Sequence, residues 1–563
     1  MLKRTFLIKV IKENAHFLIG LAITISVLWP LMRQGYFSHH DDVQVVRLFE
    51  MDKCLDDFQF PCRWVPDMGG GYGYPIFNYY APLPYYFGEF FYFVTTNLLV
   101  AAKLMFASSF VGAYVFMYLL GKSLWGKAGG AVSAIFYSLV PYHAVNLYVR
   151  GAMGEMWAMT FIPLIFYFLF RLSQKTNINS SIKLAIALAL LITSHNLSFV
   201  MFTPTIFVFA LIFYIKDHSV KFLKLFSLSI LFSLVFSAFY WLPAVAEGKY
   251  VHLETMTVGY FSYTEHFKGL RKLFIDRNWA WGPSIREVPG GEKDQMPYQV
   301  GWIHLAGYLL SLVTLWMFAN KPKRKVYRLI GIGSSIIIVA SVFMIHPRSV
   351  YVWNFFGTIL KYIQFPWRFL IVVSFFISLL SGGIFLAVKK HTWLVFVPVV
   401  LLVFVFNFSY FRPEKFLNVR QEDYLSGQTW DAQIKRSIFD YLPIFATMPP
   451  AELSTYDYEV ISGEATVKNF QKGTNWIDLE IEAENFSTVQ LSQYYFPGWK
   501  IYVNGKAVEI KYDNYLGLMT FPVDNGTSKV HAKLCNSPVR ALGNALSLMG
   551  FMVLGFYLLK RDD

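Results

Sequence analysis

The chain has 563 residues, of which 55% are hydrophobic, 19% aromatic and only 15% charged. This composition is typical of a protein that crosses a membrane many times and argues against a water-soluble globular protein. The formal charge of +14 would suit nucleic acid binding in a soluble protein. Here the basic residues lie in short runs between apolar segments, as membrane orientation requires, so we expect no nucleic acid partner.

Apolar segments recur along the chain, and a helix needs about 20 residues to cross a bilayer. The first, at about 16–32, follows the basic residues Lys3, Arg4 and Lys9 without a small-residue cleavage site, so we interpret it as an uncleaved anchor with a cytoplasmic amino terminus. The sequence predicts an all-α polytopic membrane protein with about twelve transmembrane helices, this first segment included. The others lie at roughly 101–120, 129–147, 156–172, 184–198, 199–215, 225–243, 301–319, 328–345, 368–388, 393–410 and 540–559.

The basic runs predict the orientation of these segments. If each segment crosses once, the runs at 122–127, 171–183, 216–224, 321–325 and 389–390 all face the cytoplasm. Counting the aromatic stretch 84–100 as a further span would move every later run to the outside. We therefore predict that 84–100 lies along the outer surface as an interfacial helix.

The pattern changes near the carboxyl terminus. From about 456 to 534, short stretches alternate polar and apolar residues, and Asn504-Gly505 is a strong signal for a two-residue hairpin turn. We predict a β-sandwich there, outside the membrane. The predicted organisation is a transmembrane domain over 1–410 with a first outer loop at 35–100, an extracytoplasmic region over 411–538, and a last transmembrane helix within 539–563.

A group of ionisable residues, His39-His40-Asp41-Asp42, directly follows the first span. Ionisable residues beside a bilayer are costly and tend to be functional. Adjacent carboxylates at a membrane surface suit two tasks, which are binding a cation such as Mg²⁺ or Mn²⁺ that neutralises phosphate, and accepting a proton from a hydroxyl. The alternative is a solvated acidic helix start, since Asp caps helix amino termini.

Two arginines stand at the outer ends of predicted spans. Arg150, close to Glu155, offers a planar and always charged fork for phosphate or carboxylate. The alternative is an Arg–Glu pair that closes a turn. Arg368 could face a lipid phosphate, although the aromatic residues around it are typical of interfacial anchors.

A polar turn at His195-Asn196 separates two predicted spans. Residues 184–215 must make two crossings in about 32 residues, which is shorter than two full spans. We therefore expect the turn to end inside the protein, where polar groups need partners. These side chains then either line a substrate cavity or cap a helix.

The three cysteines are too few for a disulfide framework. Cys54 and Cys62 share the first outer loop, and an oxidising compartment would allow one bridge. Two free thiols fit the sequence at least as well.

Several motifs, in one order, resemble a bacterial family of multi-pass proteins often labelled as related to 6-pyruvoyl-tetrahydropterin synthase. The family is similar to integral-membrane glycosyltransferases of the C-type fold (GT-C), and the resemblance covers about residues 1–540. These residues do not support the pterin part of the label, because they contain no histidine triad that could bind zinc. The motifs are HHDD, QVVRLFE, RWVPDMGGGYGYPIFNYYAPLPYY, YVRGAMGE, SHNLS, FYWLPA, YIQFPWRF and YYFPGWKIYVNGK.

The resemblance implies a site and a reaction. In GT-C enzymes an acidic residue in the first outer loop is the catalytic centre, and two surface helices, matching 41–60 and 83–98 here, precede the second span. Asp41 is then the first catalytic candidate and Asp42 its neighbour, with a divalent cation on the pair as an option. Residues expected to bind substrate are His40, Arg150, Glu155, His195, Asn196 and Arg368.

The implied function is that of an inverting glycosyltransferase in the cytoplasmic membrane. It would move a sugar from a polyprenyl-phosphate donor in the bilayer to a glycan, lipid or protein acceptor on the outer face, with the β-sandwich holding the acceptor. A lipid-linked sugar flippase or transporter is an alternative, although the internal repeat typical of transporters is absent from the sequence. A non-catalytic scaffold of the cell envelope is another.

Overall fold

The computed structural model describes residues 12–288, 291–318, 325–388, 390–436 and 438–560. Lys3, Arg4, Lys9 and most of the predicted basic run at 321–325 lie outside these ranges. The chain divides into two compact units, each made of three stretches. The first, called the helical unit, comprises Met1–Asp42, Lys103–Leu234 and Gly259–Asn418, and the second, called the mixed unit, comprises Val43–Ala102, Val235–Val258 and Val419–Asp563.

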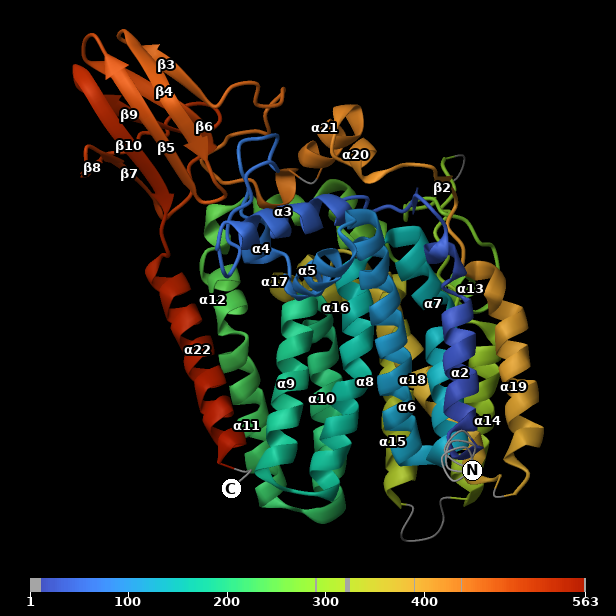
Figure 1. The fold of residues 1–563 in the computed structure, drawn as a ribbon. Helices are drawn as coiled ribbons and strands as arrows, with labels where there is room; N and C mark the ends of the chain where they lie inside the picture. Colours follow the sequence, from blue (N-terminus) through green and yellow to red (C-terminus); the bar gives the residue numbers. More distant parts are fainter. Residues whose placement is uncertain (1–11, 289–290, 319–324, 389, 437, 561–563) are drawn as a thin grey trace, which may run out of the picture. The chain divides into compact units, whose positions relative to one another are not determined.

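The helical unit is built from apolar helices that run side by side (Figure 1). Its two short strands, β1 (Tyr36–Phe37) and β2 (Phe416–Leu417), pair antiparallel. Its helices, of which α6 and α11 extend a few residues beyond the unit, are α2 (Ala15–Ser26), α6 (Leu98–Ser138), α7 (Pro141–Ala144), the π-helical turn η2 (Val145–Arg150), α8 (Met153–Gln174), α9 (Ile178–Ser194), α10 (Asn196–Asp217), α11 (Val220–Phe236), α13 (Leu270–Phe274), α14 (Trp302–Phe318), α15 (Lys325–Ile345), α16 (Val350–Phe355), α17 (Gly357–Leu360), α18 (Leu370–Ser381) and α19 (Thr392–Asn407).

Helix α18 forms the core of the helical unit, and each of its residues is buried. It packs against α14 and α15. Hydrogen bonds also tie it to α6, because Trp125 Nε1 and Ser133 Oγ both donate to the carbonyl of Leu379 at 2.8 Å. Serine and other small residues at helix contacts let backbones approach closely, which is how helices associate where the hydrophobic effect cannot hold them together.

Helix α6 is a hairpin rather than one straight helix. Its backbone breaks at Gly126, where φ is +80°. A Cβ on Gly130 would lie 2.4 Å from the backbone nitrogen of Lys122, whereas residues eight apart in a straight helix are separated by roughly 12 Å. The two arms therefore run against each other, and they correspond to the separate predicted segments at 101–120 and 129–147.

The mixed unit combines short helices, a β-sandwich and a long carboxyl-terminal helix. Helices are present in the two stretches expected to form surface helices, 41–60 and 83–98, as α3 and α5, and their place at a membrane surface stays a prediction. The helices of the unit are α3 (Gln44–Asp56), α4 (Ile76–Tyr79), α5 (Leu83–Thr95), α12 (Ala238–Ala246), α20 (Gln421–Tyr424), α21 (Gly427–Lys435) and α22 (Pro538–Leu559).

Helix α5 has the character of an interfacial helix. It spans 13 residues and ends where Thr96 adopts a left-handed conformation. It exposes 62% of Phe90 and 85% of Phe93. Burial, followed by the nearby carboxylates of Asp52 and Asp56, raises the pKa of Glu89 to about 9. A neutral Glu89 among exposed aromatic rings suits a helix that lies on a bilayer.

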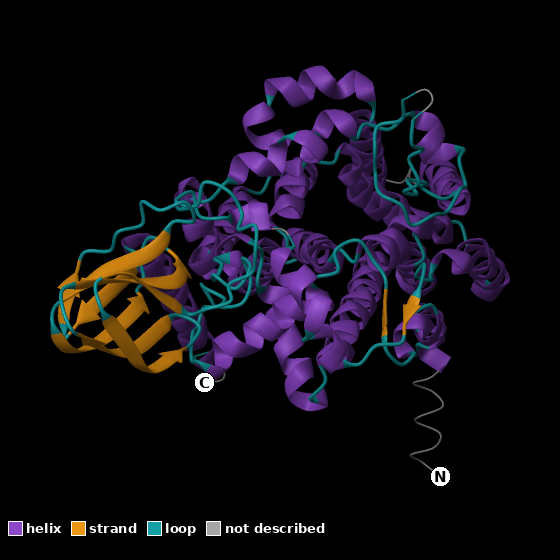
Figure 2. Ribbon diagram, turned by 90° about the horizontal axis from the view of Figure 1, so that it is seen from above, coloured by secondary structure: helices purple, strands orange, loops and turns teal. Residues whose placement is uncertain are grey.

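The predicted β-sandwich is present and occupies β3–β10 (Figure 2). One sheet has the order β4-β5-β10-β7-β8 and the other β3-β6-β9. Asn504 and Gly505 both have positive φ, at 51° and 77°, and join β7 to β8 as the hairpin turn expected from the sequence. The strands are β3 (Tyr458–Ser462), β4 (Ala465–Lys472), β5 (Trp476–Ala483), β6 (Ser487–Tyr494), β7 (Trp499–Val503), β8 (Lys506–Val508), β9 (Leu518–Val523) and β10 (Gly526–Leu534).

Buried and exposed side chains alternate along the sandwich strands. In β5, Ile477, Leu479 and Ile481 are buried while the residues between them are partly exposed. Val530 of β10 pairs with Leu479 on one side and with Val503 of β7 on the other. The alternation seen in the sequence therefore corresponds to one face of each strand packed in the core.

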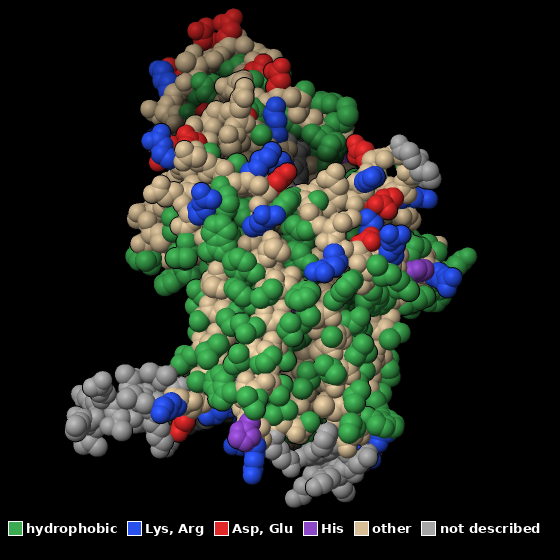
Figure 3. Space-filling view, turned by 90° about the vertical axis from the view of Figure 1, so that its right-hand side faces the viewer, with side chains coloured by type: hydrophobic (Ala, Val, Ile, Leu, Met, Phe, Trp, Pro, Cys, Tyr) green, Lys and Arg blue, Asp and Glu red, His purple; other side chains and the backbone are tan. Residues whose placement is uncertain are grey.

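The helices carry the surface expected of a membrane protein. Seven described helices are long and apolar enough to cross a bilayer, or eight if the bent pair of α11 and α12 counts as one span, while α2, α9 and α14 are shorter apolar helices. Hydrophobic side chains cover the helices on the face shown in Figure 3. Trp316 of α14, Ile336 of α15 and Val405 of α19 are each at least 64% exposed. The expected number of about twelve spans stays a prediction.

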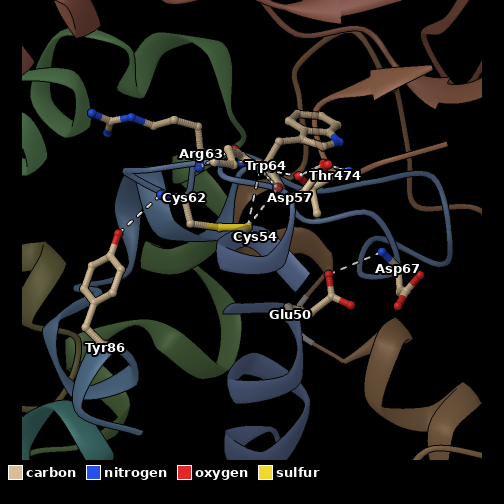
Figure 4. Close-up of a disulfide and its surroundings, with 10 residues drawn as sticks. Glu50, Cys54, Asp57, Cys62, Arg63, Trp64, Asp67, Tyr86 and Thr474 are labelled. Carbon is tan, nitrogen blue, oxygen red and sulfur yellow. Dashed lines mark hydrogen bonds between the residues drawn. A yellow bond between two sulfur atoms is a disulfide. The ribbon is translucent and has the colours of Figure 1, made fainter. Parts of the chain in front are cut away.

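The sequence left the state of the loop cysteines open, and the structure has a disulfide between Cys54 and Cys62 (Figure 4). The bridge joins the end of α3 to the segment that follows it. Cys535 is free.

We expect Ser123→Cys, in a Cys535→Ser background, to react with a maleimide only from the cytoplasmic side. Ser123 lies near the hairpin turn of α6, whereas Gly121 is unsuitable because a Cβ there would lie 3.0 Å from Gly130. Asp524→Cys, on the exposed turn between β9 and β10, serves as the outside control. Labelling of Ser123→Cys by a membrane-impermeant reagent added outside would contradict the predicted orientation and would make 84–100 a span.

Candidate active site

Charged and polar residues from distant parts of the sequence meet at one end of the helical unit. They come from the segment after α2, the turn η2, the start of α8, the junction of α9 with α10, and the segment before α18. The residues are Asp41, Arg150, Glu155, His195 and Arg368, all of which the sequence singled out.

Glu155 is the hub of this group, and its side chain is only 1% exposed. Arg150 binds it through both guanidinium nitrogens, with Nη1 donating to Oε2 at 2.5 Å and Nη2 to Oε1 at 3.1 Å. Arg368 Nε lies 3.1 Å from Oε1, and the Tyr142 hydroxyl donates to Oε2 at 2.9 Å. Two-pronged contacts of this kind are among the strongest and most directional in proteins.

The surroundings of the two arginines hold them in place. Arg150 lies over the ring of Trp367 at 4.7 Å from the ring centroid and donates to Asn146 Oδ1 at 2.5 Å. Arg368 Nη1 donates to the carbonyl of Ile363 at 2.7 Å and to Gln364 Oε1 at 3.1 Å. Each guanidinium therefore has a fixed orientation, as two-pronged recognition of phosphate or carboxylate oxygens requires.

A strained backbone position supports Arg368. Gln364 has a φ of +63°, which is uncommon for a residue with a side chain. Conformations of this kind persist where surrounding contacts enforce them, and they cluster at functional sites.

Backbone hydrogen bonds hold Asp41 next to Arg150. The amide of His40 donates to the carbonyl of Val149, and the amide of Asp41 donates to the carbonyl of Arg150, each at 2.9 Å. The Asp41 residue is exposed, and its carboxylate lies within electrostatic range of Arg150 and Arg368. Asp41 therefore stands at the rim of the cluster, while Glu155 lies beneath.

The turn η2 makes this approach possible. It is a π-helical turn, a feature often found at functional sites, and it ends at Gly151, whose φ is +64°. A Cβ at Gly151 would lie 2.2 Å from His39 Nδ1. Glycine is therefore required where the segment of His39 crosses η2. His40 lies at the surface with its Nε2 2.7 Å from the carbonyl of Trp281.

Asp42 is half-buried, and one residue separates it from the start of α3. The stretch VQVVRLFE was expected to be helical, and α3 covers it from Gln44 onward. In the described parts of the chain, no three His, Cys, Asp or Glu side chains are grouped so that they could hold a metal ion. Asp41 and Asp42 thus have no third metal ligand grouped with them among the described residues.

The expectation of a turn inside the protein is wrong for Asn196, whereas His195 stays in contact with buried residues. Helices α9 and α10 are longer than the sequence indicated, with 17 and 22 residues, so the turn need not lie deep in the protein. Asn196 is exposed and its Oδ1 accepts from the amide of Leu197 at 2.9 Å. His195 is half-buried, and its Nδ1 accepts from the amide of Ser198 at 3.2 Å, which caps α10.

His195 nevertheless belongs to the cluster. Its imidazole lies within electrostatic range of Glu155, and a Cβ on Gly154 would lie 3.1 Å from its Cδ2. Because Nδ1 accepts a hydrogen bond from an amide, the neutral ring carries its proton on Nε2. His195 therefore caps α10, as one of the two alternatives expected, and that it lines a substrate cavity stays a prediction.

Sequence reasoning missed three contributors. Tyr142 and Asn146 lie in the PYHAVNLYVR segment, which contained no charge besides Arg150 to draw attention to them. Trp367 was interpreted as an interfacial anchor, but it is buried and stacks on Arg150. The spacing of Tyr142, Asn146 and Arg150, each four residues apart, was the one available signal, since such residues share a helix face.

Residues 77–287 match the family model "6-pyruvoyl-tetrahydropterin synthase related domain; membrane protein". The resemblance to this family is confirmed over these residues. The match covers less than half of this chain. A protein of Lactococcus lactis subsp. cremoris (strain MG1363), described as uncharacterized, is 24% identical over 249 residues, which are 42% of this chain and 41% of that protein.

Among solved structures, the arabinofuranosyltransferase AftD from Mycobacteria is similar with a TM-score of 0.46 and 12% identity, covering 71% of this chain and 27% of that chain. The oligosaccharyltransferase of Archaeoglobus fulgidus, tethered to an acceptor peptide, also has a TM-score of 0.46 and 12% identity, covering 80% of this chain and 61% of that chain. This chain thus spans less than two thirds of each of these proteins.

We expect Glu155→Gln to destabilise the protein by about 3 kcal/mol, because removing one member of a buried ion pair leaves the other charges uncompensated. Thermal unfolding in detergent, followed by the loss of monodisperse protein, measures the effect. Asn196→Ala, at an exposed position in the same region, is the control and should change stability by less than about 0.5 kcal/mol. Equal stability of Glu155→Gln and the wild type would contradict the role of Glu155 as the hub.

Proposed function

We propose that the protein is an integral-membrane glycosyltransferase that moves a sugar from a polyprenyl-phosphate donor to an acceptor on the outer face of the cytoplasmic membrane. The observation that carries the proposal is the position of Asp41 beside the cluster of Arg150, Glu155 and Arg368 in a membrane protein. An exposed carboxylate next to fixed guanidinium groups offers a proton acceptor and an anion site together.

The charge balance of the cluster supports an anionic ligand. Arg150 and Arg368 share the single carboxylate of Glu155, which leaves one positive charge in excess among these three residues. The carboxylate of Asp41 faces this excess charge from an exposed position at the rim, where water screens it. The phosphate of a lipid-linked sugar would supply a closer counter-charge at the level of the membrane surface.

The chemical step requires one nucleophile and one leaving group. Asp41 accepts the proton of an acceptor hydroxyl, whose oxygen forms a bond to the anomeric carbon while the bond from that carbon to the phosphate oxygen breaks. The electron pair leaves with polyprenyl phosphate, and the arginines stabilise its charge. Single displacement inverts the anomeric centre. Because phosphate is already a good leaving group, positioning and charge stabilisation supply most of the rate enhancement.

Other residues take positioning roles in this proposal. Glu155 holds the two guanidinium groups in place beside the donor phosphate, and His195 and His40 border the donor's sugar. Asp42 is the neighbouring carboxylate, and a divalent cation on the Asp41–Asp42 pair remains a separate proposal that chelator treatment of the active protein tests. The β-sandwich contributes to holding the acceptor.

We expect Asp41→Asn to fold normally, because the residue is exposed, and to lose at least about a hundredfold of transfer activity, the usual scale for a lost general base. The assay uses purified protein in nanodiscs with radiolabelled polyprenyl-phosphate sugars and membrane extracts as acceptor. Asp42→Asn is the matched control and should lose much less. Undiminished transfer by Asp41→Asn would place the chemistry elsewhere.

A further inference from the structure

The mixed unit contains a cavity whose lining includes none of the residues proposed for catalysis. This cavity, of about 720 Å³, opens between the end of α3, the helix α21 and the first strands of the β-sandwich. Its volume falls in the range of roughly 300–1,000 Å³ that small-molecule sites occupy. The lining residues that carry the argument are Lys53, Asp67, Trp430, Tyr456, Asp457 and Lys472.

The wall of the cavity is rigid. Asp57 accepts three hydrogen bonds at 2.7 Å, from the amide and hydroxyl of Thr474 and from the indole of Trp476 (Figure 4 shows Asp57 and Thr474). Gln59 Nε2 donates to Thr474 Oγ1 at 2.9 Å, and the Cys54–Cys62 disulfide closes the same segment. This fixes the loop after α3 to β5, so the cavity keeps its shape without a ligand.

One cation in the cavity has no direct partner. Among the described residues, no hydrogen bond or ion pair engages the Lys472 ammonium, whereas Lys53 forms an ion pair with Asp67. Burial lowers the pKa of Lys472, and the carboxylates of Asp457, Asp67 and Glu50 oppose that effect from a distance. The three donor hydrogens of Lys472 are therefore available to a ligand.

The other side chains that line the cavity limit the class of ligand that it can bind. Carboxylates outnumber ammonium groups in the lining, which disfavours phosphate or another anion. Among the described residues, no three His, Cys, Asp or Glu side chains are grouped so that they could hold a metal ion. Separate donors and acceptors beside an aromatic ring, that of Tyr456 at 46% exposure, match a neutral ligand with many hydroxyl groups and an apolar ring face.

We infer that this cavity binds a neutral oligosaccharide, with Lys472 donating to sugar oxygens, Asp67 and Asp457 accepting from sugar hydroxyls, and the rings of Trp430 and Tyr456 packing against sugar rings. The assignment of this cavity as the place where a glycan acceptor docks rests on the proposed function. The binding of an oligosaccharide to the cavity does not rest on it.

The test measures binding by the full-length protein in nanodiscs, without any transfer reaction. The probes are short gluco-, galacto-, manno-, rhamno- and N-acetylglucosamine oligosaccharides, observed by saturation-transfer NMR and titrated for Kd. We expect at least one probe to bind, and Tyr456→Ala and Lys472→Met to weaken it by about tenfold or more. Tyr515→Ala and Lys506→Met are matched controls, because both residues are exposed in the same unit but outside the cavity.

Two results would overturn the inference. One is no binding by any probe up to roughly 10 mM, a concentration at which even weak sites are occupied. The other is binding that Tyr456→Ala and Lys472→Met leave unchanged. Asp41→Asn should bind the probes as tightly as the wild type, because Asp41 does not line the cavity. Wild-type protein that binds an oligosaccharide but transfers no sugar in the donor assay would refute the proposed function and leave this inference standing.

Discussion

The ion pairs of Glu155 are the interaction on which the rest of the site depends. A carboxylate that is almost fully buried is tolerated only when cations and hydrogen-bond donors surround it. Arg150, Arg368 and Tyr142 do so from three separate elements, η2, the segment before α18, and α7. Pairing with Glu155 thus requires these elements to meet, and it fixes both guanidinium groups at one end of the helical unit.

The position of Asp41 follows from the same constraint. Once Arg150 is anchored to Glu155, the carbonyl groups of Val149 and Arg150 face the segment after α2 and accept its amides. The close crossing at Gly151 leaves no room for a side chain. A carboxylate on a flexible loop would be a poor base, whereas one held by its backbone beside two fixed cations can meet a substrate in a defined geometry.

Much of this arrangement was predictable from the sequence. The apolar segments, the helix α5, the hairpin at Asn504-Gly505 and the residues of the charged cluster follow from periodicity, charge placement and turn chemistry. The partners of the cluster were not predictable, because a tyrosine or tryptophan near a membrane is usually an anchor. The depth of the His195 turn was misjudged for another reason: apolar runs mark the centre of a helix better than its ends, so α9 was expected to start later than Ile178.

The most direct test of this account is a structure of the protein in nanodiscs with a non-hydrolysable polyprenyl-phosphate sugar. The account predicts the phosphate within hydrogen-bond distance of Arg150 or Arg368, with the anomeric carbon facing Asp41. A donor phosphate bound away from both arginines, with Glu155 still holding them, would contradict it and reduce the cluster to a structural role.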